Sequence, residues 1–214
     1  MSNQTISWNV KKIVQAIHQF AIHKDMKHLN RQKIEMLFWA VDRKQLRSYG
    51  RYFTKSTYVV PTSYPTTTLV HELLFHLDDP DDVNTQYFND TVQFDADGDC
   101  AVHTDDTDYL SQVEMQVIDD VCSYFSDYTY QELRELAGRY PESFPENLQE
   151  NREVDIALFF ADPNDIHDDF FDIDPVIFAA ARETFEEIVQ LSKDIGINPV
   201  SYTHLRAHET RGNL

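Results

Sequence analysis

The stretch KIEMLFWAVDRKQLRSYG, residues 33–50, decides the fold of this chain. Its apolar residues recur every three or four positions, which predicts a helix with one face in the core. The buried stripe comprises Ile34, Leu37, Phe38 and Val41. Asn30 is a typical helix N-cap, and Gly50 is typical of the position just after a helix. The stretch contains no nucleophile, metal-ligand cluster or phosphate-binding loop, so it predicts a structural element.

The same periodicity predicts further helices on both sides of this one. We expect them over residues 7–23, over 66–77, from 111 to about 125, around 132–137, and from 175 to just before 196. Ser111 with Glu114, and Thr129 with Glu132, have the spacing of a capping box at a helix start. The apolar positions expected to be buried in the first and third of these helices are Val10, Ile13, Val14, Ile17, Phe20, Val113, Val117, Ile118, Val121 and Phe125.

One β-hairpin is predicted between the helices. The segments 87–96 and 99–106 flank Asp97-Gly98, a pair that favours a two-residue type I′ turn between antiparallel strands. The fold class is therefore α+β, mostly α-helical with a small antiparallel β-hairpin. At 214 residues the chain is long enough for a sizeable core. We expect a domain over residues 1–140 and an acidic helical extension over residues 141–199.

The last residues differ in character from the rest. The stretch VSYTHLRAHET, residues 200–210, follows a complete helix and loop without any periodicity. It resembles a translated reading frame of a sequencing adapter, so we expect residues 200–214 to be an artefact and the native carboxyl end beyond about Pro199 to be missing. The alternative is a natural disordered tail.

Charge is distributed unevenly along the chain. Residues 1–60 carry 11 Lys and Arg against 3 Asp and Glu, whereas residues 61–199 carry 5 against 33. An acidic body repels phosphate backbones, so general nucleic-acid binding is not expected. Two interpretations of the acidic loops stay open: they keep the protein in solution, or they attract a basic protein partner. The apolar runs are too short to span a bilayer or act as a signal peptide, so we expect a cytoplasmic protein without a membrane partner.

The sequence contains no convincing catalytic or metal motif. Five glycines provide no dinucleotide or phosphate fingerprint. The histidines of HELLFH, His71 and His76, are five residues apart, whereas the zinc-protease helix needs four. The acidic run at residues 95–106 has Cys100 where a calcium loop needs glycine. We therefore nominate no catalytic, cofactor-binding or metal-binding residue, although residues 166–174 could bind a hard cation weakly. Cys100 and Cys122 are expected to be reduced.

Two segments resemble a known family in the same order and with a hairpin between them. Residues 33–50 are similar, without a gap, to the signature helix of the Panacea domain, the antitoxin SocA-like family. LSQVEMQVIDDVCSYFSDYTYQEL, residues 110–133, is similar to the family's second signature. The matching positions include Lys33, Ile34, Leu37, Trp39, Asp42, Arg43, Leu46, Tyr49, Gly50, Leu110, Ser111, Glu114, Val121, Tyr124 and Leu133. Departures are Tyr64-Pro65-Thr66 in place of Gly-Pro-Val, and Ala137-Gly138 in place of a Thr-His pair.

The resemblance implies a non-catalytic antitoxin that neutralises a toxin by direct contact. The toxin is often encoded by an adjacent gene, and related members act as adaptors for proteolysis, which would add a protease such as ClpXP as a partner. We expect Arg43, Lys44, Arg47 and Arg51 to form a basic exposed edge. The candidate partner-binding residues are Arg43, Arg47, Arg51, Asp165, Asp168, Asp169 and Asp172.

Two alternatives from other classes stay open. One is a phage-related or DNA-associated regulatory protein that uses the basic first 60 residues. The other is a metal-dependent hydrolase.

Overall fold

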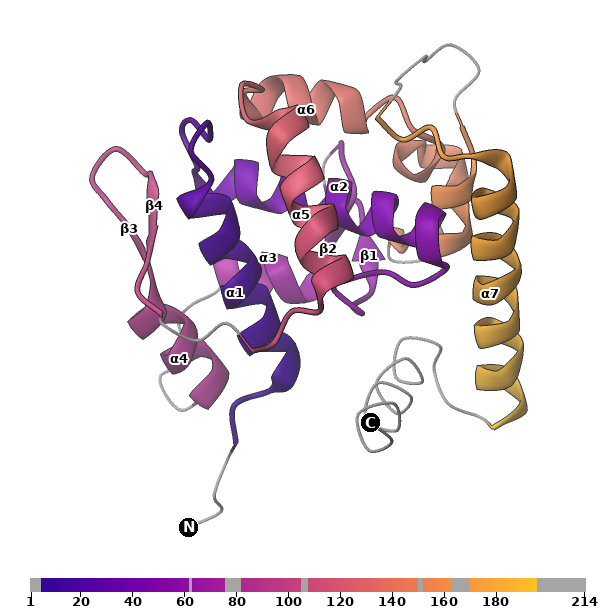
Figure 1. Cartoon of the computed structure of the whole chain (residues 1–214), viewed down its shortest axis with the longest axis horizontal. Coiled ribbons are helices and arrows are strands. Elements are labelled where there is room, and N and C mark those ends of the chain that lie inside the picture. Colours follow the sequence, from indigo (N-terminus) through magenta and orange to yellow (C-terminus); the bar gives the residue numbers. More distant parts are fainter. Residues whose placement is uncertain are drawn as a thin grey trace.

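A central helix organises the fold. The structure is a computed structural model that describes residues 5–61, 63–75, 82–104, 108–149, 152–162 and 170–195. Helix α2 (Arg31–Tyr49) crosses the middle of the molecule and the other elements surround it (Figure 1). Its predicted stripe of Ile34, Leu37, Phe38 and Val41 has no exposed surface, which confirms the prediction. Ten of its other fifteen side chains are buried too, because neighbours cover most of the surface of α2.

The remaining helices enclose α2. They are α1 (Trp8–Ile22), α3 (Thr68–Phe75), α4 (Val83–Thr91), α5 (Gln112–Phe125), α6 (Tyr130–Ala137) and α7 (Pro175–Asp194). Short 3₁₀ turns follow α6 at Pro141–Ser143, Pro145–Asn147 and Ile156–Phe160. None of the helices in the described ranges is long and apolar enough to cross a membrane.

The predicted starts of α2, α5, α6 and α7 are confirmed. The Asn30 side chain accepts a hydrogen bond from the Lys33 backbone N–H at 2.8 Å. Ser111 and Thr129 each head a complete capping box, in which side chain and backbone satisfy one another's polar groups. Asp174 caps α7, whose first residue is Pro175. These contacts confirm the predicted starts. The starts could be predicted because each cap depends only on residues close in sequence.

The β-structure is smaller than expected, and part of the prediction is wrong. Strands β3 (Val92–Phe94) and β4 (Cys100–Val102) form the predicted hairpin, but residues 87–91 belong to α4. Gly98 has a positive φ of 87° whereas Asp97 does not, so the turn is not type I′. Instead the Asp95 side chain accepts hydrogen bonds from the backbone N–H groups of Asp97 and Asp99, which stabilises a longer loop. The described residues are therefore α+β and mostly helical.

Two further predictions need correction. The helix expected over residues 66–77 begins two residues later, because Thr66–Thr67 form strand β2 against β1 (Tyr58–Val59). Residues 76–81 lie outside the described residues. In α5, Val117, Ile118, Val121 and Phe125 are buried as expected, but Val113 is 45% exposed. Val113 stands in the first turn of α5.

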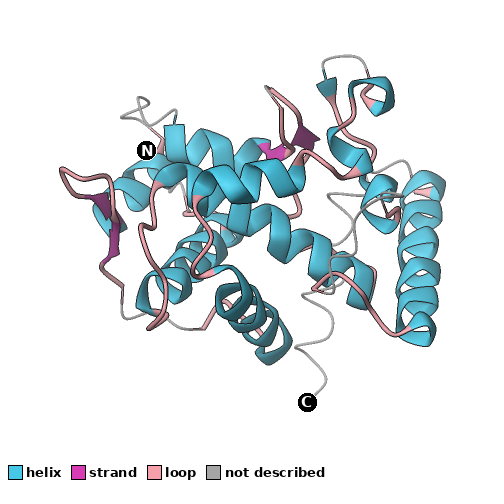
Figure 2. Ribbon diagram, turned by 90° about the horizontal axis from the view of Figure 1, so that it is seen from above, coloured by secondary structure: helices cyan, strands magenta, loops and turns pink. Residues whose placement is uncertain are grey.

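The segment after residue 140 packs against the same core as the segment before it. Phe159, Phe171, Ala181 and Phe185 are buried in one continuous apolar cluster with the side chains of α2. Helix α7 lies along the outer edge of the molecule in two perpendicular views (Figures 1 and 2). The buried residues of the expected acidic extension are thus part of the core of the preceding domain.

Gly50 allows α7 to approach α2. Its φ of +68° is in the left-handed region, which favours glycine at a helix end. A Cβ at this position would also overlap the Ala181 carbonyl oxygen and lie 2.8 Å from the Thr184 Cβ. Both the end of α2 and the close packing of α7 therefore require a residue without a side chain.

Candidate functional site

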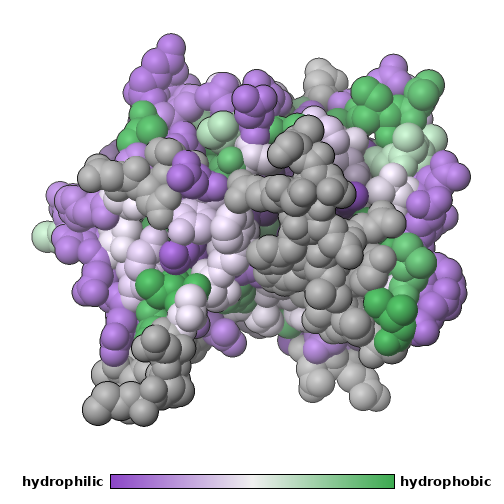
Figure 3. All heavy atoms as spheres, turned by 60° about the horizontal axis from the view of Figure 1, so that its bottom comes forward, coloured by the Kyte–Doolittle hydropathy of each residue, from purple (hydrophilic) through white to green (hydrophobic). Residues whose placement is uncertain are grey.

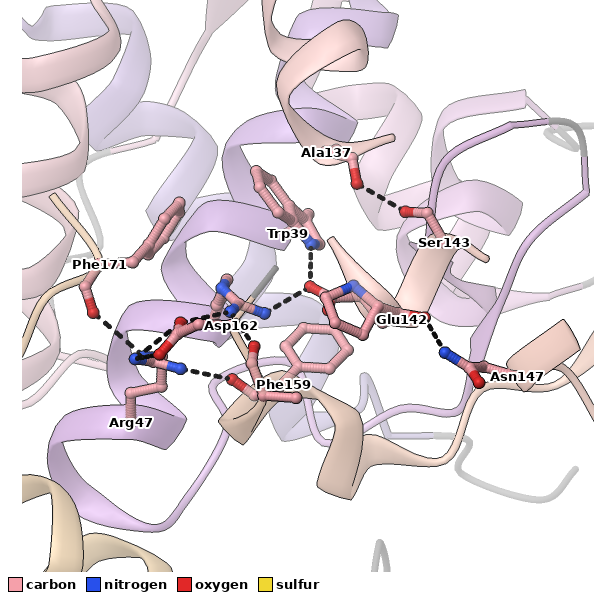
Figure 4. A network of polar contacts seen from close by, with 12 residues as sticks. Trp39, Arg47, Ala137, Glu142, Ser143, Asn147, Phe159, Asp162 and Phe171 are labelled. Carbon is pink, nitrogen blue, oxygen red and sulfur yellow. Dashed lines mark hydrogen bonds and ion pairs between the residues drawn. The ribbon is translucent and has the colours of Figure 1, made fainter. Parts of the chain in front are cut away.

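The signature helix places an ion pair in the core. Arg43 Nη1 donates to Glu142 Oε1 at 2.7 Å, and both side chains have no exposed surface. Trp39 Nε1 donates to the same oxygen at 3.1 Å (Figure 4). The guanidinium also lies 4.0 Å from the Tyr140 ring centre. Burial raises the pKa of Glu142, and the neighbouring Arg43 charge opposes that rise.

A second arginine on α2 extends this network toward the surface. Arg47 donates to the backbone carbonyls of Phe171 at 3.0 Å and of Phe159 at 3.3 Å. It also pairs with Asp162, whose carboxylate is 55% exposed, at 3.0 Å (Figure 4). Arg43 and Arg47 thereby connect α2 to several separate points in residues 142–171. Because the guanidinium groups satisfy buried carbonyls, their role is to hold the loop-rich segment onto the helix.

The expectation of a basic exposed edge is therefore wrong for Arg43 and Arg47. Arg43 is 0% and Arg47 3% exposed, whereas Lys44 is half-buried with its Nζ donating to the Phe170 carbonyl. Arg51 is exposed as expected. Of the 11 basic residues in positions 1–60, all of them described, only Lys24, Lys27 and Arg51 are exposed. Of these 11 side chains, four are buried and four are half-buried, so most of the positive charge of the amino-terminal part is at least partly covered.

Two buried carboxylates on α2 anchor neighbouring elements. Asp42 accepts hydrogen bonds from the Thr54 backbone N–H at 2.9 Å, the Thr54 hydroxyl at 2.5 Å and the Tyr58 hydroxyl at 2.6 Å. Desolvation raises the pKa of Asp42 although these bonds oppose the rise. Glu35 accepts from the Tyr64 hydroxyl at 2.9 Å and the Thr66 hydroxyl at 2.5 Å. These contacts fix the β1–β2 region against α2.

His71 joins the Glu35 group. Its Nδ1 lies 2.8 Å from Glu35 Oε1, and about a third of its side chain is exposed. His76 lies outside the described residues, so the structure places only the first histidine of HELLFH. His71 therefore has a structural partner on α2.

The described residues offer little for catalysis. No group of three or more His, Cys, Asp or Glu that could hold a metal ion is found among them. In the segment considered for a cation, residues 166–174, residues 166–169 lie outside the described residues. Burial raises the pKa of both the Cys100 and Cys122 thiols to about 12, so neither is an activated nucleophile.

A cavity of about 630 Å³ lies beside the end of α6. Its lining residues are Ser63, Gln131, Arg134, Glu135, Gly138 and Arg139. Arg134 Nε donates to the Ser63 hydroxyl at 2.9 Å, so this hydroxyl faces a cation and is not activated by a base. The lining mixes both charges and is open to solvent, which suits a polar contact surface better than a reaction site.

The outer surface is acidic. Among the described Asp and Glu residues only Glu35, Asp42 and Glu142 are buried. Asp172 is exposed at the approach to α7, as a partner-binding residue must be. Asp165, Asp168 and Asp169 lie outside the described residues.

Sequence reasoning missed the two carboxylates that pair with the arginines. Glu142 follows Pro141 in a segment without periodicity, and Asp162 stands among many other acidic residues. No local pattern marks either of them, because their partners on α2 are 99 and 115 positions away. A buried helix that carries two arginines is the one signal that buried acceptors must exist elsewhere in the chain.

Comparison with known proteins places these residues in a family. A comparison with curated proteins and one with solved structures each gave no significant match. The sequence model of the antitoxin SocA-like, Panacea domain family matches residues 32–141, about half of the chain. This span contains α2 with Trp39, Asp42 and Arg43, both capping boxes, and the hairpin between them. The chain therefore belongs to the antitoxin SocA-like, Panacea domain family.

Proposed function

We propose that this chain is the antitoxin of a toxin–antitoxin system and neutralises its toxin by direct protein–protein contact. Membership of the antitoxin SocA-like family is the observation that carries the proposal. The match supports an antitoxin-like, non-enzymatic role in general terms, and the toxin and the mode of neutralisation are inferred.

The distribution of charge supports a basic partner. Arg43 and Arg47 of the signature helix are buried and stabilise the fold. The charged residues that remain on the surface are therefore mainly acidic. A field of one sign steers a partner of opposite charge during diffusional encounter. We therefore infer a toxin with a basic contact surface, encoded by an adjacent gene, and retain Arg51, Asp172 and the acidic residues 165, 168 and 169 as proposed contacts. Handover of the bound toxin to a protease such as ClpXP is a further proposal from the family resemblance.

The DNA-associated alternative loses its main support. It relied on the basic first 60 residues, but Arg43, Arg47, Lys12 and Lys33 are buried. Lys27, one of the three exposed cations there, is paired with Asp127. The remaining exposed positive charge is too small to offset the repulsion between an acidic surface and phosphates.

Growth rescue tests the proposed function. The reading frame adjacent to the gene is expressed from an inducible promoter, alone and together with the full chain. We expect growth arrest by the adjacent product and recovery when this chain is present. As controls, Arg43→Ala should destabilise the fold strongly and weaken rescue, whereas Ser123→Ala, at an exposed position in α5, should leave both the fold and the rescue unchanged. Arrest without rescue by the unmodified chain would refute the proposal.

A further inference from the structure

Helix α7 carries an apolar stripe that the core does not use. Ile177 is 50% and Leu191 39% exposed, and Ile195, just after the helix, is 51% exposed. Half-buried Thr184 lies between the first two and also borders Gly50 at the end of α2. Ile177, Thr184 and Leu191 are seven residues apart, and Ile195 follows after four, so at 3.6 residues per turn all four share one side of the helix. The buried face, with Ala181, Phe185, Ile188 and Ser192, lies next to this stripe.

An acidic row borders the stripe on its solvent side. Glu183, Glu187 and Asp194 are separated by four and seven residues, so they form one row along α7 next to the apolar positions. All three are exposed. The exposed cations of α7, Arg182 and Lys193, lie on the other side of the helix, where Arg182 pairs with Glu186 at 3.0 Å. Among the side chains of α7, the charge next to the stripe is therefore of one sign, while the exposed Arg51 follows Gly50, which borders Thr184 from the end of α2.

The surface view agrees with this arrangement. Helix α7 lies at the right of Figure 1, and Figure 3, which is turned about the horizontal axis, shows hydrophobic surface beside hydrophilic surface along the same edge. Apolar residues exposed singly are common, whereas a row of them along one side of a helix is a candidate interaction surface.

We propose that the stripe of Ile177, Thr184, Leu191 and Ile195 on α7 is the docking surface for a basic amphipathic helix of the toxin. This inference rests on the proposed function and names the surface that would carry it out. Helix α7 lies outside the 32–141 span that matches the family, so the surface belongs to this chain's own carboxyl-terminal part.

The spacing and the charge select this kind of occupant. Side chains spaced by seven residues, here Ile177, Thr184 and Leu191, pack best against another helix lying nearly parallel to theirs, with charged residues flanking the seam. From residue 177 to 195 the stripe spans about 27 Å, enough for a partner helix of about five turns. The acidic row favours Lys or Arg beside the partner's own apolar stripe.

A second copy of this chain fits less well. In a symmetric pair of α7 helices the seam would be lined by acidic rows from both copies, and like charges across a seam oppose association. The charge therefore favours a partner of opposite sign over self-association.

Neighbouring glutamates on α7 provide a matched test. Glu187→Lys changes the row beside the stripe, whereas Glu186→Lys makes the same change on the other side of the helix. With the purified product of the adjacent gene, we expect Glu187→Lys to slow association roughly fivefold or more at low salt and Glu186→Lys to change it less than about twofold. Equal effects of the two variants would overturn the docking surface. Thermal melting checks that both variants stay folded.

Photocrosslinking identifies the occupant directly. Benzoylphenylalanine replaces Leu191 in the full chain, and Lys193 in the control, and the cross-linked peptides are identified by mass spectrometry. We expect position 191, and not position 193, to cross-link to a helical segment of the toxin. Cross-links from 191 to a second copy, to residues 196–214 of the same chain, or to nothing would each overturn the proposal. Growth rescue by the unmodified chain together with any of these results would leave the proposed function standing and refute only the surface.

Discussion

Arg43 on the signature helix and Glu142 just after the family match form an ion pair, 2.7 Å between Nη1 and Oε1, with neither side chain exposed. This ion pair connects the first signature to the carboxyl-terminal part of the chain. Breaking such a pair leaves an uncompensated charge in the core. We expect Arg43→Ala to lower the free energy of unfolding by about 3–5 kcal/mol in urea denaturation.

Arg51→Ala is the control for that variant, since Arg51 is an exposed arginine just beyond the carboxyl end of α2. Its effect should stay within about 0.5 kcal/mol. Comparable losses for the two variants would contradict the assignment of Arg43 to the scaffold.

The second prediction concerns Gly50. Gly50→Ala should destabilise the protein through both the positive φ and the overlap with α7. Gly98 is the matched control: its φ is also positive, but a Cβ added there would have no atom within 4 Å. Backbone strain alone should cost about 1–2 kcal/mol in Gly98→Ala, and Gly50→Ala should cost distinctly more in the same urea titration. Equal costs would show that α7 does not press against Gly50.

Helix caps give a third prediction. Ser111→Ala and Thr129→Ala should each lower the free energy of unfolding by about 0.5–2 kcal/mol, because each removes one half of a capping box. Ser123→Ala, at an exposed position within α5, should have little effect. If all three variants unfold at the same temperature as the unmodified chain, the caps contribute nothing to stability.

Asp42 gives a fourth prediction, on pH. Its pKa is raised in the folded state, so the folded protein holds the proton more tightly than the unfolded chain does. The unmodified protein should therefore gain stability relative to Asp42→Asn as the pH falls from 7 toward the ordinary aspartate pKa of about 4. Chemical denaturation of both proteins across this range measures the difference. A difference that stays constant, or grows in the opposite direction, would contradict the raised pKa.

Sequence reasoning succeeded where local contacts decide the structure. Asn30, Ser111 and Thr129 cap helices through residues only three positions away, so their patterns could be recognised directly. The apolar stripe of α2 was likewise visible, because burial of Leu37 and Phe38 follows from periodicity.

Sequence reasoning was wrong mainly where contacts between distant segments decide whether a side chain is buried. Arg43 and Arg47 resemble the exposed cations of an amphipathic helix, and only Glu142, Asp162 and the Phe171 carbonyl make them internal. Helix α4 is a local failure: Tyr87 and Phe88 suggested a strand, although the Asp82 cap through the Thr85 N–H at 2.9 Å is itself a contact over only three positions. The stripe on α7 was hidden for a related reason: Ile177 and Leu191 look like core residues until the packing of Ala181 and Phe185 shows which face is buried.

The most direct test of the account is the rate at which this chain associates with the product of the adjacent gene, measured by stopped flow at increasing salt. If the acidic surface attracts a basic toxin, the association rate should fall by roughly an order of magnitude or more between low and above-physiological salt, with little change in dissociation. Neutralising the acidic residues 165, 168, 169 and 172 together should slow association at low salt in the same way. An association rate that does not depend on salt would contradict the claim, and would show that the acidity does not steer the partner.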